Sequence, residues 1–163
     1  MKTLLIVHDS VTGGARQMAQ AAARGASAEG ETAVRLVHAD DAGPADLLAA
    51  DGFIFVAPEM LAALSGRMKY FFDRTYYAVL DRVEGRPCAL LVCAGSDGEN
   101  ALRQLTRIAA GWRLRQIAEP LIVCTHAQTP EAILAPKTMG AADLKRAEDL
   151  GAAFAAGLAL GVF

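Results

Sequence analysis

Near the start of the chain stands the sequence Leu4-Leu5-Ile6-Val7-His8-Asp9-Ser10-Val11-Thr12-Gly13-Gly14-Ala15-Arg16. Its first four residues form a continuous apolar run, which is typical of a strand at the buried centre of a parallel sheet. A polar turn with two glycines follows, and then a helical pattern that places Met18, Ala19 and Ala22 on one face. Backbone N–H groups and the positive end of a helix dipole attract anions at such a junction. The sequence therefore predicts a phosphate site in this turn.

The rest of the chain alternates short apolar runs with amphipathic stretches. Further strands are expected at 32–37, 52–57, 88–93 and 121–124, and Pro58 is expected to end the third strand. After the first helix, further helices are expected at 45–50, from 65 onward, at 99–111 and at 140–158. This alternation predicts an α/β fold with a doubly wound, five-stranded parallel sheet in a three-layer sandwich. We expect a single domain spanning residues 1–163, with ligands at the carboxyl ends of the strands.

Composition narrows the class of protein. The chain has 163 residues, of which 16 are basic and 18 acidic, for a net charge of −2. This balance offers no general attraction to nucleic acid or to an anionic membrane surface, so we expect neither partner. Cys88, Cys93 and Cys124 match no zinc-binding spacing and are expected to be reduced. Neither a signal peptide nor a membrane-spanning run is present, so a cytoplasmic location is expected.

Three predicted loops should meet at one edge of the sheet, because they follow the first, third and fourth strands. They cover residues 9–16, 58–66 and 94–100. The first is the predicted anion site, the second is largely apolar, and the third offers small residues whose N–H groups can approach a ring edge closely. A flat heterocycle that carries a monophosphate would satisfy all three loops.

These residues resemble a known family. The turn Ser10-Val11-Thr12-Gly13-Gly14-Ala15 resembles the FMN phosphate loop of flavodoxins and their reductase relatives. Residues 57–74 and 86–98 are similar to the proline-containing loop, the helix and the flavin-edge loop of NAD(P)H-dependent FMN reductases and flavin-dependent quinone reductases. The resemblance covers roughly the whole chain, and it implies a flavodoxin-like fold with FMN as cofactor and NAD(P)H as co-substrate.

The resemblance also implies which residues hold the cofactor. The FMN phosphate would contact Ser10, Thr12, Gly13, Gly14 and Ala15. One side of the isoalloxazine ring would contact Pro58, Glu59, Met60, Leu61 and Ala62. The other edge would contact Ala94, Gly95, Ser96, Asp97 and Gly98. Ala15 stands where many relatives have a hydroxyl, and neither ring-facing loop has the Trp or Tyr that flavodoxins stack on the flavin.

The function that the resemblance implies is hydride transfer from NAD(P)H through FMN to a quinone or another small-molecule acceptor. By analogy with relatives, a homodimer or a larger homo-oligomer is expected. The missing aromatic residues speak against a flavodoxin-type carrier of single electrons, which is the alternative function. A second alternative is a flavodoxin-fold domain that has lost its flavin and its catalysis. No side chain is assigned an acid or base role, and no metal is expected.

Several of these residues also have a purely structural interpretation. Ser10 and Thr12 could be turn or cap residues, and Asp97 could cap the following helix instead of facing a ring N–H. Met60 and Leu61 could belong to the core. His8 and His126 could supply protons to a reduced quinone, although a structural role is the simpler interpretation of each.

Overall fold

Parallel strands form the centre of the molecule. In the computed structural model, which describes residues 1–28 and 30–163, they follow the order β2-β1-β3-β5, and both β6 and β7 pair with β5. The parallel strands are β1 (Lys2–His8), β2 (Thr32–His38), β3 (Gly52–Met60), β5 (Pro87–Ala94), β6 (Arg115–Gln116) and β7 (Leu121–Cys124). A two-residue strand, β4 (Ala63–Leu64), pairs with β3 in the antiparallel direction.

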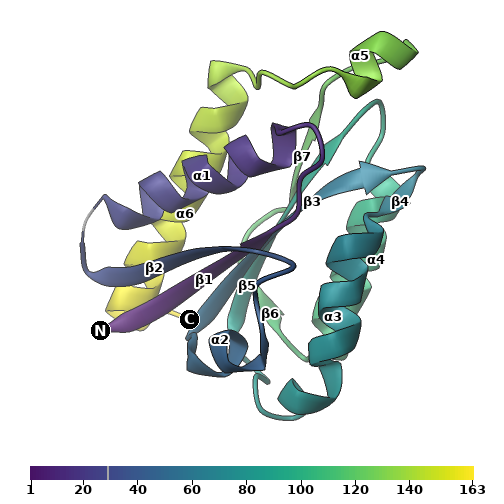
Figure 1. Cartoon of the computed structure of the whole chain (residues 1–163). Coiled ribbons are helices and arrows are strands. Elements are labelled where there is room, and N and C mark those ends of the chain that lie inside the picture. The colour runs from purple at the N-terminus through teal and green to yellow at the C-terminus, as the bar shows by residue number, and fades with distance from the viewer. Residues whose placement is uncertain (29) are drawn as a thin grey trace.

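Helices cover both faces of this sheet (Figure 1). On one face lie α1 (Gly14–Ser27) and α6 (Ala141–Leu160). On the other face lie α2 (Pro44–Ala49), α3 (Gly66–Val79) and α4 (Glu99–Gly111). The short helix α5 (Pro130–Leu134) follows β7 and lies above the carboxyl ends of the strands, at the end of the molecule where α1 begins. None of the helices described is long and apolar enough to cross a membrane.

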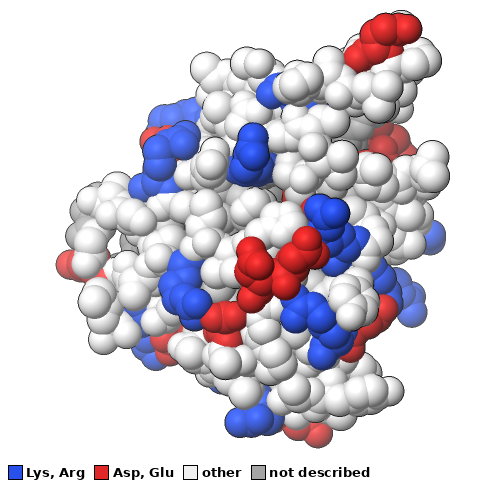
Figure 2. Space-filling model, in the orientation of Figure 1, with Lys and Arg blue, Asp and Glu red and all other residues white. Residues whose placement is uncertain are grey.

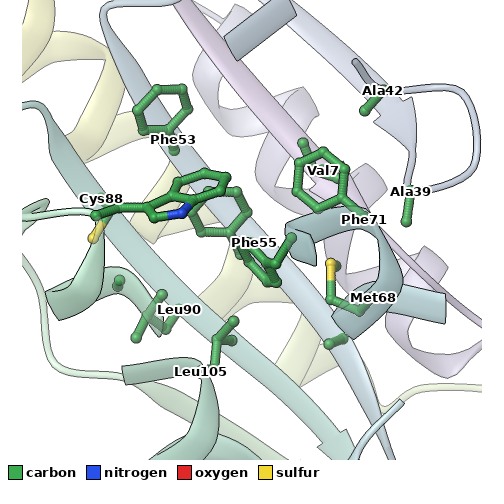
Figure 3. Close-up of a cluster of buried hydrophobic side chains, with 14 of the residues drawn as sticks. Val7, Ala39, Ala42, Phe53, Phe55, Met68, Phe71, Cys88, Leu90 and Leu105 are labelled. Carbon is green, nitrogen blue, oxygen red and sulfur yellow. The ribbon is translucent and has the colours of Figure 1, made fainter. Parts of the chain in front are cut away.

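The two faces of the sheet are packed by different kinds of residue. The face under α3 and α4 holds an aromatic cluster in which the rings of Phe55 and Phe72 are 5.1 Å apart and those of Phe72 and Trp112 are 5.2 Å apart. Figure 3 shows part of this core, with Phe53, Phe55 and Phe71 turned toward its centre. The pair Phe71 and Phe72 is therefore core, as the sequence predicts.

The other face is packed by small residues, so α1 and α6 approach each other closely. A Cβ atom on Gly25 would lie 1.9 Å from the backbone oxygen of Glu148, and one on Gly151 would lie 2.0 Å from the backbone oxygen of Ala22. Only glycine fits at these two positions. The contact fixes α1, and with it the turn that precedes α1, against the rest of the fold.

The predicted fold is confirmed, although the described sheet has the two-residue strands β4 and β6 in addition to the five expected, and the predicted end of the third strand is wrong. Pro58 does not end the third strand, because β3 continues to Met60 and pairs there with β4. The turn of this hairpin consists of Leu61 and Ala62, both with positive φ, at 49° and 61°. Hairpin turns of this kind are usually built from Asn and Gly. Since neither residue occurs here, the sequence carried no signal for the hairpin.

Candidate functional site

A cleft of about 450 Å³ lies at the carboxyl ends of the strands, a volume within the usual range of small-ligand sites. The loops that follow β1, β3, β5 and β7 all contribute to its lining. Of the fifteen residues predicted to hold a cofactor, these twelve line it: Ser10, Thr12, Gly14, Ala15, Pro58, Glu59, Met60, Leu61, Ala62, Ala94, Gly95 and Ser96. The structure thus brings the three predicted loops together.

The turn between β1 and α1 forms one end of this cleft. Gly13 has φ of 97°, and its N–H donates to Oγ of Ser10 over 3.1 Å, so Ser10 acts as a turn residue. Gly14 and Ala15 are buried at the start of α1, where the first N–H groups of a helix have no partner within the helix. Among the described residues, no oxygen accepts a hydrogen bond from either N–H. These N–H groups are free to bind an anion.

Close packing keeps this turn next to β5. A Cβ atom on Gly14 would lie 2.6 Å from Sγ of Cys93 and 3.2 Å from Sδ of Met139. Glycine therefore lets the turn approach the strand. Cys93 also lines the cleft, and burial raises its pKa to about 11. Its side chain is a neutral thiol at pH 7, so the cleft has no reactive thiolate at this position.

The hairpin of β3 and β4 forms the opposite end of the cleft and is largely exposed. Met60 is 43% exposed and Leu61 101%, so the interpretation of these two residues as core is wrong. Side chains of α4 hold the hairpin in place, since Nδ2 of Asn100 donates to the oxygen of Ala62 over 2.7 Å and Oε1 of Gln104 accepts from the N–H of Leu64 over 2.7 Å.

Glu59 connects the two loops that were predicted to face the ring. Its Oε2 accepts a hydrogen bond from the N–H of Gly98 over 2.7 Å. Gly98 has φ of 85° and precedes α4, while Oδ1 of Asp97 accepts weakly from the N–H of Glu99 over 3.4 Å. Neither Asp97 nor Gly98 is among the residues that line the cleft, so their contact with a cofactor stays a prediction.

Gly13, the remaining predicted residue, lies in an adjoining hollow. This hollow has a volume of about 240 Å³, a size below the usual range of small-ligand sites, and it shares Ser10, Val11 and Thr12 with the main cleft. Leu134 is shared with the main cleft as well, whereas Arg16 lines this hollow and not the cleft. The turn between β1 and α1 is therefore accessible from two sides.

The sequence missed the contribution of the segment after β7. Six of its residues line the cleft, namely Thr125, Ala127, Gln128, Ile133, Leu134 and Lys137. Val11 and Cys93 are the other two lining residues that were not predicted. The position of this segment after a parallel strand was the one available signal, because every such loop emerges at the same edge of the sheet.

The two histidines considered as proton donors are absent from the residues that line the cleft. His8 is only 8% exposed, and its pKa is lowered, chiefly by burial and then by the neighbouring His38. The rings of these two histidines are 5.3 Å apart, and Asp9 carries its carboxylate 3.5 Å from Nε2 of His38. In the described part of the chain, no group of three or more His, Cys, Asp or Glu residues is arranged to hold a metal ion.

Charges of both signs surround this end of the sheet. Asp9 also lies 3.6 Å from Nη1 of Arg67, and Asp40 lies 3.4 Å from Nε of the same arginine. Figure 2 shows a small acidic group at the centre of the visible face with basic residues on either side of it. That face therefore presents no extended surface of a single sign.

Comparison with known proteins gives two kinds of similarity. Residues 42–129 match the family model described as NADPH-dependent FMN reductase. A curated protein of Aquifex aeolicus named flavodoxin is 35% identical over 101 residues, which are 61% of this chain and 55% of that protein. The match thus spans little more than half of that relative.

Solved structures share the fold over nearly the whole chain. A flavodoxin from the domain Archaea superposes with a TM-score of 0.79 at 18% identity, covering 96% of this chain and 98% of its own. A WrbA-like flavodoxin from Agrobacterium tumefaciens superposes with a TM-score of 0.75 at 22% identity, covering 99% of both chains. These two likenesses establish the flavodoxin-like fold.

Proposed function

The chain belongs to the NADPH-dependent FMN reductase family, and on that premise we propose that it binds FMN in the cleft and transfers hydride from NAD(P)H to an apolar small acceptor. When bound, FMN would supply the chemistry, accepting a hydride and passing on two electrons. A quinone is the acceptor class that we favour. The residues of the chain would bind and orient the reactants.

The observation that carries this proposal is the convergence of the predicted loops on one cleft. At one end, Gly14 and Ala15 are buried and their N–H groups have no acceptor within residues 1–28 and 30–163. They begin a helix whose dipole favours a phosphate. The close approach of Gly14 to Cys93 leaves no room for a side chain there. These features fit a phosphate monoester.

The opposite end fits a flat ring. Pro58, Met60 and Ala62 supply apolar surface, and the loop at Ala94–Ser96 supplies small residues on the other side. In this part of the described chain no Phe, Tyr or Trp lines the cleft. An isoalloxazine ring without a stacked aromatic residue would keep one face accessible to a nicotinamide, which supports hydride transfer.

The mouth of the cleft supports an apolar acceptor. Five exposed apolar residues are among those that line it: Val11, Met60, Leu61, Ile133 and Leu134. Burying such side chains against an apolar partner is favourable, at roughly 25 cal/mol per Å². This contact would stabilise the binding of a quinone ring, whereas it would not stabilise the binding of an ionic acceptor such as a metal chelate.

Anaerobic titration tests the proposal. Added FMN should bind with quenching of its fluorescence, NADPH or NADH should then bleach its absorbance, and a naphthoquinone should restore it. Binding without bleaching would remove the reductase activity but leave the FMN site. The variant Leu61→Ser should raise the KM for the naphthoquinone about twofold to fivefold, the scale of one partly buried apolar contact.

A carrier of single electrons is the second candidate, because the curated relative with 35% identity is named flavodoxin. A dithionite titration followed by absorbance separates the two functions. A carrier should take up its two electrons in two resolved steps, and a hydride-transfer enzyme in one. Protein that binds no FMN at all would favour the third possibility, a domain that has lost its flavin.

The assembly state can be measured on the same protein preparation. We propose a homodimer or larger homo-oligomer, in keeping with the analogy to family relatives. Tyr70, Tyr76 and Tyr77 on α3 are exposed and would suit a contact between subunits. Sedimentation equilibrium should give a mass at least twice the 17.1 kDa of the chain.

A further inference from the structure

Residues 125–137, here called the β7 strap, run along the cleft from its middle to the anion-binding turn. We propose that this strap is a fourth wall of the cofactor site, in which Lys137 supplies the cation for the phosphate and Gln17 holds Lys137 in position. The inference rests on the proposed FMN site and adds a phosphate-selective element to it.

Backbone hydrogen bonds attach the strap at both ends. At its start, the N–H of Thr125 donates to the oxygen of Ala94 over 2.9 Å and the N–H of His126 donates to the oxygen of Gly95 over 2.7 Å. At its end, the N–H of Lys137 donates to the oxygen of Thr12 over 2.8 Å. The strap thus bridges the loop at the ring end and the turn at the phosphate end. Figure 1 shows α5, its central part, above that edge of the sheet.

Gln17 fixes the end of the strap to the anion-binding turn. Its Nε2 donates to the oxygen of Gly13 over 3.0 Å and to the oxygen of Lys137 over 2.7 Å. Its Oε1 accepts from the N–H of Met139 over 3.1 Å. All three bonds need a side chain with both a donor and an acceptor, and an amide of this length provides them.

Lys137 brings a positive charge to the cleft. Its Nζ donates to the oxygens of Ala132, Ile133 and Ala135 over 2.8, 2.9 and 2.6 Å, at the C-terminal end of α5. Among the described residues, no carboxylate lies within 4.0 Å of this ammonium group. These three bonds use all the N–H donors of the ammonium group, so it would act on an anion at the adjacent turn through its positive charge, which the neutral carbonyl groups do not cancel.

This arrangement predicts selectivity for the phosphate rather than for the ring. A phosphate monoester against the free N–H groups of Gly14 and Ala15 would lie in the field of the helix N-terminus and of Lys137 together. The charge is held by the strap instead of by a freely moving side chain, so little ordering entropy is lost when the phosphate binds. Riboflavin has the same ring without the phosphate and would gain nothing from Lys137.

The test compares FMN and riboflavin as probes of the full-length chain at low salt, by fluorescence titration. Lys137→Met should weaken FMN binding about tenfold and riboflavin binding less than twofold, a scale expected for one positive charge that acts through space on a phosphate at low salt. Lys137→Arg keeps the charge and should restore most of the loss. Gln17→Met removes both donors and the acceptor without adding a negative charge beside the phosphate, and it should weaken FMN binding about threefold to tenfold, since the strap is then released.

Matched controls are present on the same elements. Lys145→Met removes an exposed lysine of α6 that pairs with Asp149, and Gln20→Met changes an exposed glutamine of α1. Neither should alter FMN affinity. Thermal unfolding of each variant checks that the fold is retained, and the FMN-to-riboflavin ratio is insensitive to a general loss of stability.

The outcomes separate this inference from the proposed function. A loss confined to FMN supports the strap. If wild-type protein binds FMN, and Lys137→Met and Gln17→Met either bind it equally well or lose FMN and riboflavin in parallel, the strap is overturned and the FMN site is left intact. Wild-type protein that binds neither flavin would overturn the proposed function and the strap with it.

Discussion

The two ends of the cleft are built in opposite ways. At the phosphate end, Gly14 and Ala15 are buried, and packing against Cys93 and Met139 holds the turn in place. At the ring end, the hairpin tip is fully exposed, and Leu61 and Ala62 both have left-handed backbones that cost roughly 1–2 kcal/mol per residue. One end is rigid and the other is strained and accessible.

This difference suggests a division of roles. A preformed anion site loses little conformational entropy when its ligand binds. Most of the affinity for a phosphorylated cofactor should therefore come from the rigid end. Apolar residues at the exposed end can meet different partners, so the choice of electron acceptor should be decided there. The substitutions below test this division, beginning with the largest expected effect.

The first prediction concerns the support under the phosphate end. In Gly151→Ala, the new Cβ atom would lie 2.0 Å from the backbone oxygen of Ala22, so α6 must move away from α1. We expect a loss of about 3 kcal/mol in the free energy of unfolding, the upper part of the range for overpacking. Urea denaturation measures it.

Gly111→Ala is the matched control, because a Cβ atom at this helical position meets nothing within 4 Å. It should stabilise the protein by at most about 1 kcal/mol. Equal losses in the two variants would show that the contact between α1 and α6 is not specially tight.

The second prediction changes the turn itself. The Cβ atom of Gly14→Ala would lie 2.6 Å from Sγ of Cys93, so the turn must shift away from β5. We expect a loss of about 1–3 kcal/mol in stability and at least about a tenfold rise in the Kd for FMN. Fluorescence titration of FMN gives the second value.

A second substitution identifies the cause. Cys93→Ala removes the atom that the new Cβ would meet, so the double variant should recover much of the FMN affinity. Failure of this rescue would mean that Gly14 is required for its backbone conformation or for contact with the cofactor, and not for its distance from Cys93.

How much of this could be predicted from the sequence differs between the two ends. The strands and most helices followed from apolar periodicity. The position of the turn proposed to hold the phosphate followed from a strand, a glycine turn and a helix in direct succession. Each of these signals is local. The hydrogen bond from Gln17 to Lys137 joins residues that are 120 positions apart, and no local sequence pattern predicts such a bond.

The ring end was harder for the same reason. Leu61 and Ala62 form a hairpin turn against their own backbone preferences, and side chains of Asn100 and Gln104 hold that hairpin from α4. Prediction from sequence relies on residues that favour the conformation they adopt. A turn formed by residues that disfavour its conformation is therefore not predicted. The role of Glu59 in joining two loops likewise depends on their distance in space.

The third prediction tests the hydrogen bond between Glu59 and the N–H of Gly98. Glu59→Ala removes the acceptor of the Gly98 N–H, and with it one of the hydrogen bonds that connect the two ring-facing loops. Stability should fall by about 1 kcal/mol, as for one ordinary hydrogen bond, and FMN and riboflavin should both bind about threefold to tenfold more weakly. Weaker binding of both flavins is expected for a substitution at the ring end, whereas substitution of Lys137 should weaken the binding of FMN alone. Glu59→Gln keeps an oxygen acceptor, so its stability and its affinity for the two flavins should fall less than in Glu59→Ala.

The smallest effect is expected from relieving the strain at the hairpin tip. Ala62 has φ of 61°, where glycine has no steric penalty, and its oxygen accepts from Asn100 through the backbone alone. Ala62→Gly should therefore raise the free energy of unfolding by about 1 kcal/mol, while Ala63→Gly, in the strand next to it, should lower that energy by a similar amount. Urea denaturation with FMN absent measures both. If Ala62→Gly also destabilises the protein, the tip is not strained, and the contrast between a relaxed phosphate end and a strained ring end does not hold.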